Sequence, residues 1–228
     1  GDGWGYGGNI GVLCKVNSEW TCGLSYRSET SVKLSGETKV DAYAPIVGVI
    51  RSEISSSSTK MTLPANLGFG IVYRPEEKLI VSADVDWTEW SSYDRFVITN
   101  DTPGGLITST SMCVNDWKNT IRYSLGLHYK IDNNFNIYTG YYIDPSPIPD
   151  KTLTPWVPDC GTKQGFDLSL GYTVKTAEFI CGYEYMSASS RTVTGAPQDV
   201  DGDGVVDNLP GNYTLKSGNV RLGMNILF

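Results

Sequence analysis

Long apolar segments are missing from this 228-residue sequence, and no run approaches the ~18 apolar residues of a membrane-spanning helix. A basic excess is also missing, because 25 acidic residues outnumber 18 basic ones and give a net charge of −7. We therefore expect no nucleic-acid partner, since a phosphate-binding surface needs positive charge. A transmembrane β-barrel stays possible, because a barrel strand exposes only every second residue to lipid.

Histidine and closely spaced cysteines are equally scarce. His128 is the sole histidine, and the five cysteines have no CxxC spacing, so we expect neither a zinc site nor an enzyme that needs histidine beside serine. Cys113 and Cys160 both fall in segments that we predict to be long outer loops, where an oxidising compartment allows a disulfide. Two separate thiols are the alternative, and the sequence leaves both open.

The last ten residues show what the sequence does contain. Apolar residues alternate with small or polar ones from Asn219 to Phe228, which is the period of a strand with one apolar face. The chain stops on this strand with an aromatic residue, in a pattern that resembles the signal read by the barrel-insertion machinery. An edge strand of a soluble β-sandwich is the alternative. The apolar positions are Val220, Leu222, Met224, Ile226 and Phe228.

The same alternation recurs in eight further segments, so the sequence predicts about nine strands. Carboxylates at alternate positions, such as Asp84 and Asp86, indicate that the face opposite the apolar one is wet. The eight segments are 6–16, 20–34, 63–73, 79–99, 121–130, 135–141, 166–172 and 179–185.

The connections between these segments are sorted by length. Short turns follow the first, third, fifth and seventh predicted strands, and the other connections are long. Outer-membrane barrels have this plan of short periplasmic turns and long external loops, whereas a soluble sandwich has no reason for it. We therefore predict an all-β fold, an antiparallel transmembrane β-barrel in the bacterial outer membrane. The long connections include Ala42–Lys60, where the alternation breaks, a Gly/Thr/Ser-rich loop that ends at Asp116, and the proline-rich Pro145–Pro158.

An odd number of strands does not suit a single-chain bacterial barrel, which has an even number. The final strand runs toward the periplasm and, by alternation, so does the first, which requires an outward strand before it. The sequence also begins without the basic segment and apolar run of a signal peptide. We therefore expect residues 1–228 to be the C-terminal portion of one barrel domain, with an N-terminal part absent from this chain.

Four segments together resemble the FadL/TodX family of outer-membrane transporters for long-chain fatty acids and other hydrophobic compounds. The resemblance implies a barrel of fourteen strands, of which this chain holds the last nine, and an N-terminal hatch that is not represented here. The tract from Pro155 to Gly165 departs from the charged loop expected in that family. The segments are NIGVLCKVNSEWTCGLSYRS, LPANLGFGIVYRPEEKLIVSADVDWTEWSSYD, WKNTIRYSLGLHYKIDNNFNIYTGYYIDPSPIPD and GNYTLKSGNVRLGMNILF.

The family implies passive uptake, in which outer loops capture a hydrophobic ligand that then enters the lumen. The apolar stretch from Tyr43 to Ile50 is a candidate capture surface, and a loop packed on its neighbours is the alternative. A carboxylate head group would need a cation in the lumen, and the candidates on the inward register are Arg27, Arg122 and Lys130. Each of them has the alternative role of an ion-pair partner for a lumen carboxylate.

Several functional alternatives stay open at this stage. An aromatic hydrocarbon would need no cation, and the sequence does not separate it from a fatty acid. A general diffusion porin and a soluble β-rich adhesin or binding domain are weaker alternatives. A barrel lipid hydrolase is not expected, because His128 lies on the inward register, out of reach of membrane lipid. We expect no required cofactor, and the oligomeric state stays open.

The segment from Asp199 to Asp207 (DVDGDGVVD) has oxygen ligands at every second position, which suits a hard cation with ~6–8 oxygen ligands. We therefore predict a calcium site in the last outer loop, although the bidentate glutamate of an EF-hand is lacking. An acidic solvated loop is the alternative. The expected ligands are the side chains of Asp199, Asp201, Asp203 and Asp207, and the carbonyl of Val205.

Overall fold

The structure is a computed structural model that describes residues 1–154, 159–199 and 206–226. Its main element is a nine-stranded antiparallel sheet with the order β16-β13-β12-β11-β10-β7-β6-β3-β2. When the strands that belong to other sheets are left out, each strand of this sheet pairs with the strands before and after it in the chain. The prediction of about nine antiparallel barrel strands is therefore confirmed. The strands are β2 Asn9–Lys15, β3 Trp20–Arg27, β6 Asn66–Glu76, β7 Leu79–Thr88, β10 Thr120–Lys130, β11 Phe135–Asp144, β12 Lys163–Val174, β13 Ala177–Ala188 and β16 Lys216–Ile226.

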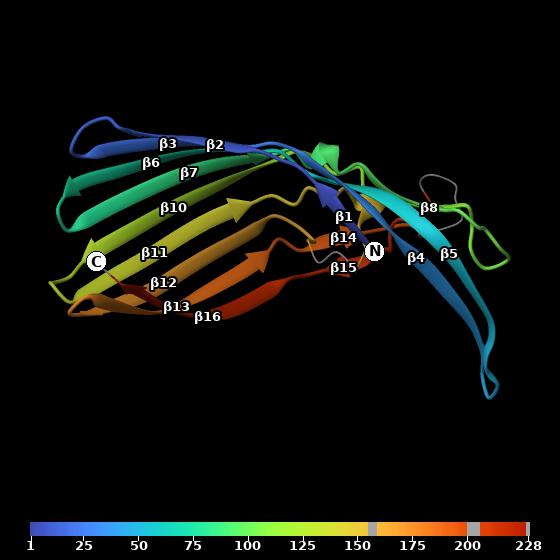
Figure 1. Ribbon diagram of the computed structural model, residues 1–228. Coiled ribbons are helices and arrows are strands. Elements are labelled where there is room, and N and C mark those ends of the chain that lie inside the picture. Colours follow the sequence, from blue (N-terminus) through green and yellow to red (C-terminus); the bar gives the residue numbers. More distant parts are fainter. Residues whose placement is uncertain (155–158, 200–205, 227–228) are drawn as a thin grey trace.

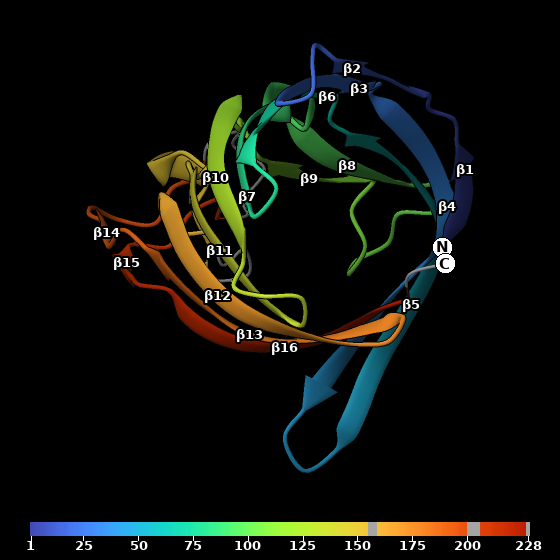
Figure 2. The same cartoon turned by 90° about the vertical axis from the view of Figure 1, so that its left-hand side faces the viewer.

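The sheet curves into a trough that forms part of a barrel wall, with β2 and β16 as its edges among the described residues (Figures 1 and 2). The turns β2–β3, β6–β7, β10–β11 and β12–β13 lie together at one end, and the longer connections leave from the other end (Figure 1). We call these the short-turn end and the outer end. Their separation is the one expected from the sequence. No helix in the described ranges is long and apolar enough to cross a membrane.

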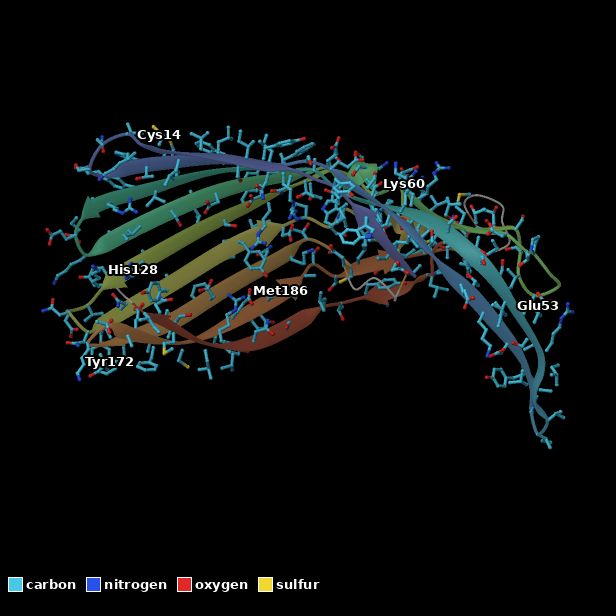
Figure 3. The ribbon with its side chains drawn as sticks, in the orientation of Figure 1. Cys14, Glu53, Lys60, His128, Tyr172 and Met186 are labelled. Atoms are coloured by element: carbon cyan, nitrogen blue, oxygen red, sulfur yellow. The ribbon has the colours of Figure 1, made fainter. Side chains whose placement is uncertain are left out.

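The register separates the two faces of the trough. One row across the sheet, Ile10–Tyr26–Leu67–Trp87–Ile121, is entirely apolar or aromatic, whereas the adjacent row, Gly11–Ser25–Gly68–Asp86–Arg122, is small or charged. Figure 3 shows Cys14 and Tyr172 on the outer side of the ribbon, while His128 and Met186 lie over the hollow side. The outer face therefore suits lipid and the inner face suits a wet lumen.

A second, five-stranded sheet lies at the outer end and has the order β1-β4-β5-β8-β9. It overturns four details of the expected elements. The predicted loop 42–60 is mostly strand, and the predicted loop that ends at Asp116 contains strand β9, on which Cys113 lies. The predicted strand 20–34 breaks after Arg27 before it changes sheet, and the predicted strand 79–99 is interrupted by a short 3-10 helix. The elements are β1 Asp2–Gly5, β4 Thr30–Ala44, β5 Gly48–Leu63, η1 Trp90–Ser92, β8 Arg95–Asn100 and β9 Thr110–Val114.

The β4–β5 hairpin, which extends beyond the barrel wall (Figure 1), was missed because apolar and polar residues do not alternate along β5. The Ser55–Ser58 run that suggested a flexible surface pairs with Ser35–Thr38 in the ladder. An irregularity between Ala42 and Tyr43 shifts the register near the tip, which further obscures the period of two.

The buried apolar residues lie in the connections at the outer end. Ile148, Leu153 and Val193 form a small cluster, and Trp117 and Tyr213 pack against it. This cluster joins η2 (Asp150–Thr152) to the two-stranded sheet of β14 (Arg191–Val193) and β15 (Gly211–Tyr213).

The five cysteines do not gather at one site. Cys14 and Cys22 are direct cross-strand partners on β2 and β3. Cys113 is exposed on β9, Cys160 is buried, and the described cysteines form no disulfide.

Glu53 on β5 binds the connection between β8 and β9 to the β4–β5 hairpin. Its carboxylate accepts backbone N–H groups from Gly105 at 3.0 Å, Leu106 at 2.8 Å and Ile107 at 3.1 Å, and it forms an ion pair with Arg51. The hydrogen bond from Leu106 is the main reason why the pKa of Glu53 lies below its ordinary value. The folded state therefore favours the charged form of this side chain.

Acidification should release residues 104–107 from the hairpin. Because the pKa of Glu53 is lowered by folding, its stabilisation is complete above the ordinary glutamate pKa and is lost as pH falls through the lowered value. We expect faster amide hydrogen exchange in 104–107 for Glu53→Gln at pH 7, and little change for Glu37→Gln, an exposed residue of the same hairpin. Equal exchange in the two variants would show that Glu53 does not hold this segment.

The β12–β13 turn contains a strained position that offers a second test of the fold. Lys175 has φ = +54°, a conformation that costs an L-residue about 1–2 kcal/mol and glycine much less. Lys175→Gly should therefore raise the thermal midpoint of the detergent-purified protein, with a gain of about 0.5–1 kcal/mol. Thr176→Gly, at the next residue of the same turn, should lower the midpoint, and the opposite order would contradict the turn geometry.

Candidate functional site

Arg122 stands on the inner face of β10, two residues from the outer end of the strand. Its guanidinium carbon lies 4.4 Å from the centre of the Tyr142 ring on β11, a cation–π contact. Asp86 is its direct cross-strand partner on β7. Nevertheless, Arg122 forms no ion pair with any carboxylate in the described part of the chain.

The reason lies in the glycines of the neighbouring strands. The carboxylate of Asp86 leans away from Arg122 over Gly68, where its Oδ1 is 2.7 Å from the position that a Cβ on Gly68 would take. On the other side, the ring of Tyr142 covers Gly165 so closely that a Cβ there would overlap it. Asp86 and Tyr142 thus both fill spaces that glycine leaves, and the guanidinium of Arg122 stacks on the tyrosine instead of pairing with the carboxylate.

A hollow of about 230 Å³ adjoins Arg122 at the outer end of the lumen. Trp90 and Lys163 also line it, together with carboxylates. Lys163 forms ion pairs with Asp144 at 3.4 Å and Asp159 at 2.7 Å, so its charge is neutralised. Of the two cations that line this hollow, Lys163 is paired, whereas Arg122 has no carboxylate within ion-pair distance among the described residues.

The other two predicted cations do not join this site. Lys130 lies eight residues farther along β10 at the short-turn end, about 26 Å away at ~3.3 Å per residue. Arg27 is level with Thr120 through the partners Asn66 and Thr88, but β3 is three strands from β10, about 14 Å at ~4.8 Å per strand. One carboxylate head group would therefore meet Arg122 alone.

A second hollow of about 450 Å³ lies along β2, β3 and β6. Its lining includes Leu13 and four glycines at positions 11, 23, 68 and 70, which leave the wall without side chains. Asp84 and Asp86 stand at its edge, and neither forms an ion pair in the described ranges. This hollow offers room for an apolar group but carries negative charge at one side.

Sequence reasoning missed two polar networks that cross the inner face toward β16. Glu178 accepts hydrogen bonds from Asn136 at 2.7 Å, Tyr138 at 2.7 Å and Asn225 at 3.1 Å. The ring of His128 stacks on Tyr138 with centroids 4.5 Å apart, and its Nε2 lies 3.0 Å from Oδ1 of Asn136. His128 is thus part of the wall, on the inward register as expected.

The second network is centred on Glu184. It pairs with Arg221 at 2.5 Å and accepts a hydrogen bond from Asn219 at 3.3 Å. Glu178 and Glu184 are only 6% and 8% exposed, so both carboxylates need these partners. Neither of them pairs with Arg27, Arg122 or Lys130 among the described residues, although the sequence made each a candidate partner. The sequence signal that could have predicted these networks is the presence of polar residues at inward-facing positions of adjacent strands.

The predicted calcium loop is described only at its two ends. Asp201, Asp203 and Val205 lie outside the described residues. Asp199 is exposed, whereas Asp207 is buried and accepts the backbone N–H of Val114 at 3.4 Å. The described residues contain no group of three or more metal-ligating side chains, and the calcium site stays a prediction.

The stacking arrangement on the inner face can be tested at Gly165. A methyl group there would overlap the Tyr142 ring, so Gly165→Ala should destabilise the protein by about 1–3 kcal/mol through overpacking. Gly223→Ala on β16 is the control, because a Cβ there would meet only an ordinary contact at 3.9 Å with Ile180. Thermal unfolding of both variants in detergent measures the difference, and equal midpoints would contradict the close tyrosine–glycine contact.

Known proteins share both the sequence pattern and the barrel wall. The chain is 25% identical over 214 residues to the long-chain fatty acid transport protein of Escherichia coli K12, which covers 90% of this chain and 46% of that protein. It is 24% identical over 234 residues to outer membrane protein P1 of Haemophilus influenzae, which covers 98% of this chain and 47% of that protein. The chain thus spans about half the length of these curated relatives.

Solved structures show the same fold. A Pseudomonas aeruginosa FadL homologue matches with a TM-score of 0.69 at 18% identity, over 95% of this chain and 49% of that one. The Ralstonia pickettii toluene transporter TbuX matches with a TM-score of 0.64 at 16% identity, over 99% and 49%. The Escherichia coli relative and TbuX are named as transport proteins. The family model of the outer membrane protein transport proteins (OMPP1/FadL/TodX) matches residues 1–228, and the chain therefore belongs to this family of the outer membrane.

Proposed function

We propose that the protein moves hydrophobic small molecules across the outer membrane through a β-barrel, of which this chain supplies a large part of the wall. The observation that carries the proposal is the division of the sheet into an apolar outer face and a polar, glycine-rich inner face with hollows. Between its edges β2 and β16, such a wall is compatible with lipid because neighbouring strands satisfy each other's backbone hydrogen bonds. The family membership supports the same conclusion.

We propose an amphipathic carboxylate, such as a long-chain fatty acid, as the ligand of the outer hollow. Arg122 supports this choice, because its guanidinium faces the hollow without a carboxylate partner and can form charge-assisted hydrogen bonds. The similar proteins include a long-chain fatty acid transport protein and a toluene transporter, so the family alone does not decide the ligand.

An uncharged aromatic hydrocarbon is the second candidate, and one observation favours it. The glycine-lined hollow along β2, β3 and β6 has Asp84 and Asp86 at its edge and no lysine or arginine in its lining, whereas the outer hollow, which Asp86 also lines, contains Arg122 and Lys163. Two carboxylates without cationic partners would repel a fatty acid head group at this position. A hydrocarbon would meet no such repulsion, so the two hollows favour different ligand classes.

The tip of the β4–β5 hairpin is our proposed capture surface. It carries Tyr43, Ile46, Val47, Val49 and Ile50, all at least 50% exposed. An apolar surface of this kind can hold a hydrophobic ligand before the ligand reaches the lumen. The hairpin leaves the wall at the outer end, on the same side as the Arg122 hollow (Figure 1).

Other parts of the proposal concern the whole barrel. We propose that this chain corresponds to the last nine strands of a fourteen-stranded barrel with an N-terminal hatch, and that the sheet contacts outer-membrane lipid directly. Phe228, the proposed signal for the insertion machinery, lies outside the described residues. A general diffusion porin is less well supported, because the named relatives transport fatty acids or aromatic hydrocarbons.

Arg122→Ala tests the fatty acid proposal. The loss of a charge-assisted hydrogen bond worth about 1.5–3 kcal/mol should weaken fatty acid binding by roughly 10–100-fold. Lys130→Ala is the matched control, because Lys130 is an inward cation far from the hollow, and it should bind normally. Equilibrium binding of a labelled fatty acid to the detergent-purified protein measures both variants, and thermal unfolding confirms that each is folded.

The outcomes separate the two ligand classes. If Arg122→Ala retains labelled fatty acid as well as the unchanged protein does, Arg122 is not a ligand contact. If the unchanged protein binds toluene but no fatty acid, the carboxylate proposal fails while transport of hydrophobic compounds stands. Binding of neither class would contradict the transport proposal itself.

A further inference from the structure

A third hollow, of about 560 Å³, lies outside the lumen site on the five-stranded sheet at the outer end. Lys33 on β4, Lys60 on β5 and Arg95 on β8 line it together. Figure 3 labels Lys60 at the base of the β4–β5 hairpin, where this sheet leaves the barrel wall. None of these residues has a part in the proposed transport site.

The register places the cations on one face of three adjacent strands. Lys33 and Lys60 are direct cross-strand partners, so their side chains leave the sheet on the same side. Two pairs farther along, and therefore on the same face, Ser35 faces Ser58, and Ser58 in turn faces Thr99 on β8. Because alternate residues share a face, Arg95 on β8 stands on the same side as Thr99.

The two lysines stand opposite each other without a compensating carboxylate. Like charges at directly opposed positions destabilise a sheet, and no ion pair of Lys33 or Lys60 exists among the described residues. Two carboxylates share their face. Asp2 on β1 is the cross-strand partner of Ser35 but forms no ion pair with either lysine, and Glu37 lies four residues from Lys33 on β4, about 13 Å along the strand at ~3.3 Å per residue. The arrangement therefore costs stability in the isolated protein and would be relieved by a bound anion.

We infer that this hollow binds a phosphate group. Arg95 is neutralised by Asp94 at 2.8 Å, which leaves the two lysines as the net charge of the site. A phosphomonoester carries about −1.5 to −2 charges at pH 7 and has three acceptor oxygens. The hydroxyls of Ser35, Ser58 and Thr99 add donors to the ammonium groups around the same space.

A phosphate fits this hollow better than a fatty acid carboxylate does. A carboxylate carries one charge and would leave one lysine uncompensated. Leu34 and Val97 are the large apolar residues among those that line the hollow, which is little surface for a long acyl chain. The phosphate could belong to a lipid head group of the outer membrane surface or to a free phosphorylated molecule, and both have the same oxyanion chemistry.

The double variant Lys33→Gln/Lys60→Gln tests the inference. Equilibrium dialysis of the detergent-purified protein against radiolabelled inorganic phosphate at low ionic strength should show one saturable site. The double variant should bind phosphate at least about tenfold more weakly, because two charge-assisted contacts are removed. Both lysines are exposed, so the substitutions leave the packing intact, and thermal unfolding checks this.

The matched control is Lys15→Gln/Lys78→Gln, which removes the same charge from exposed positions at the short-turn end. It should bind phosphate as the unchanged protein does. An equal loss in both double variants, or no saturable binding at millimolar phosphate, would overturn the inference. Octanoate binding as tight as phosphate binding would overturn the choice of phosphate.

A further arm of the experiment identifies the source of the phosphate. Dioctanoyl phosphatidic acid is compared with inorganic phosphate on the unchanged protein and on Lys33→Gln/Lys60→Gln. Tighter binding of the short-chain lipid that is lost in the double variant assigns the site to a lipid head group. Equal affinities for lipid and phosphate, both lost in the variant, assign it to a free phosphorylated molecule.

Discussion

Backbone hydrogen bonding between neighbouring strands is the constraint on which the rest of this structure depends. Lipid offers no partners for N–H and C=O groups, so the strands must satisfy one another along the whole wall. This pairing sets the register, and the register places apolar side chains toward lipid and small or charged ones toward the lumen. Because a shift of one residue would reverse every side chain, the two faces are determined together.

Glycine gives the inner face its particular chemistry. On a pleated sheet, a side chain ordinarily meets only the residue opposite, but a glycine in the next strand lets it reach farther. Asp86 leans over Gly68 and Tyr142 covers Gly165, which leaves Arg122 stacked on a ring and free of its cross-strand carboxylate. Glu178 uses Gly171 in the same way, and it thereby joins side chains of β11 and β16.

The outer end follows a different rule. There the alternation of apolar and polar residues is lost along β5, and many of the residues that face each other across the β4–β5 ladder are polar. Stability at this end comes from local contacts, such as the carboxylate of Glu53 on three backbone amides and the small cluster around Leu153. The charged side chains of Lys33 and Lys60 lie on one face of the same sheet.

The sequence by itself determined the nine barrel strands, the sorting of turns and the inward position of Arg122, because lipid on one face imposes a period of two that can be read residue by residue. It did not reveal the hairpin sheet, since β5 lacks this period of two. Tertiary structure decided how Arg27 lies relative to Arg122 and that Arg122 has no ion pair among the described residues. The reason is that a strand's period specifies a face, whereas distances across the sheet depend on register, and contacts depend on where a neighbouring glycine leaves space.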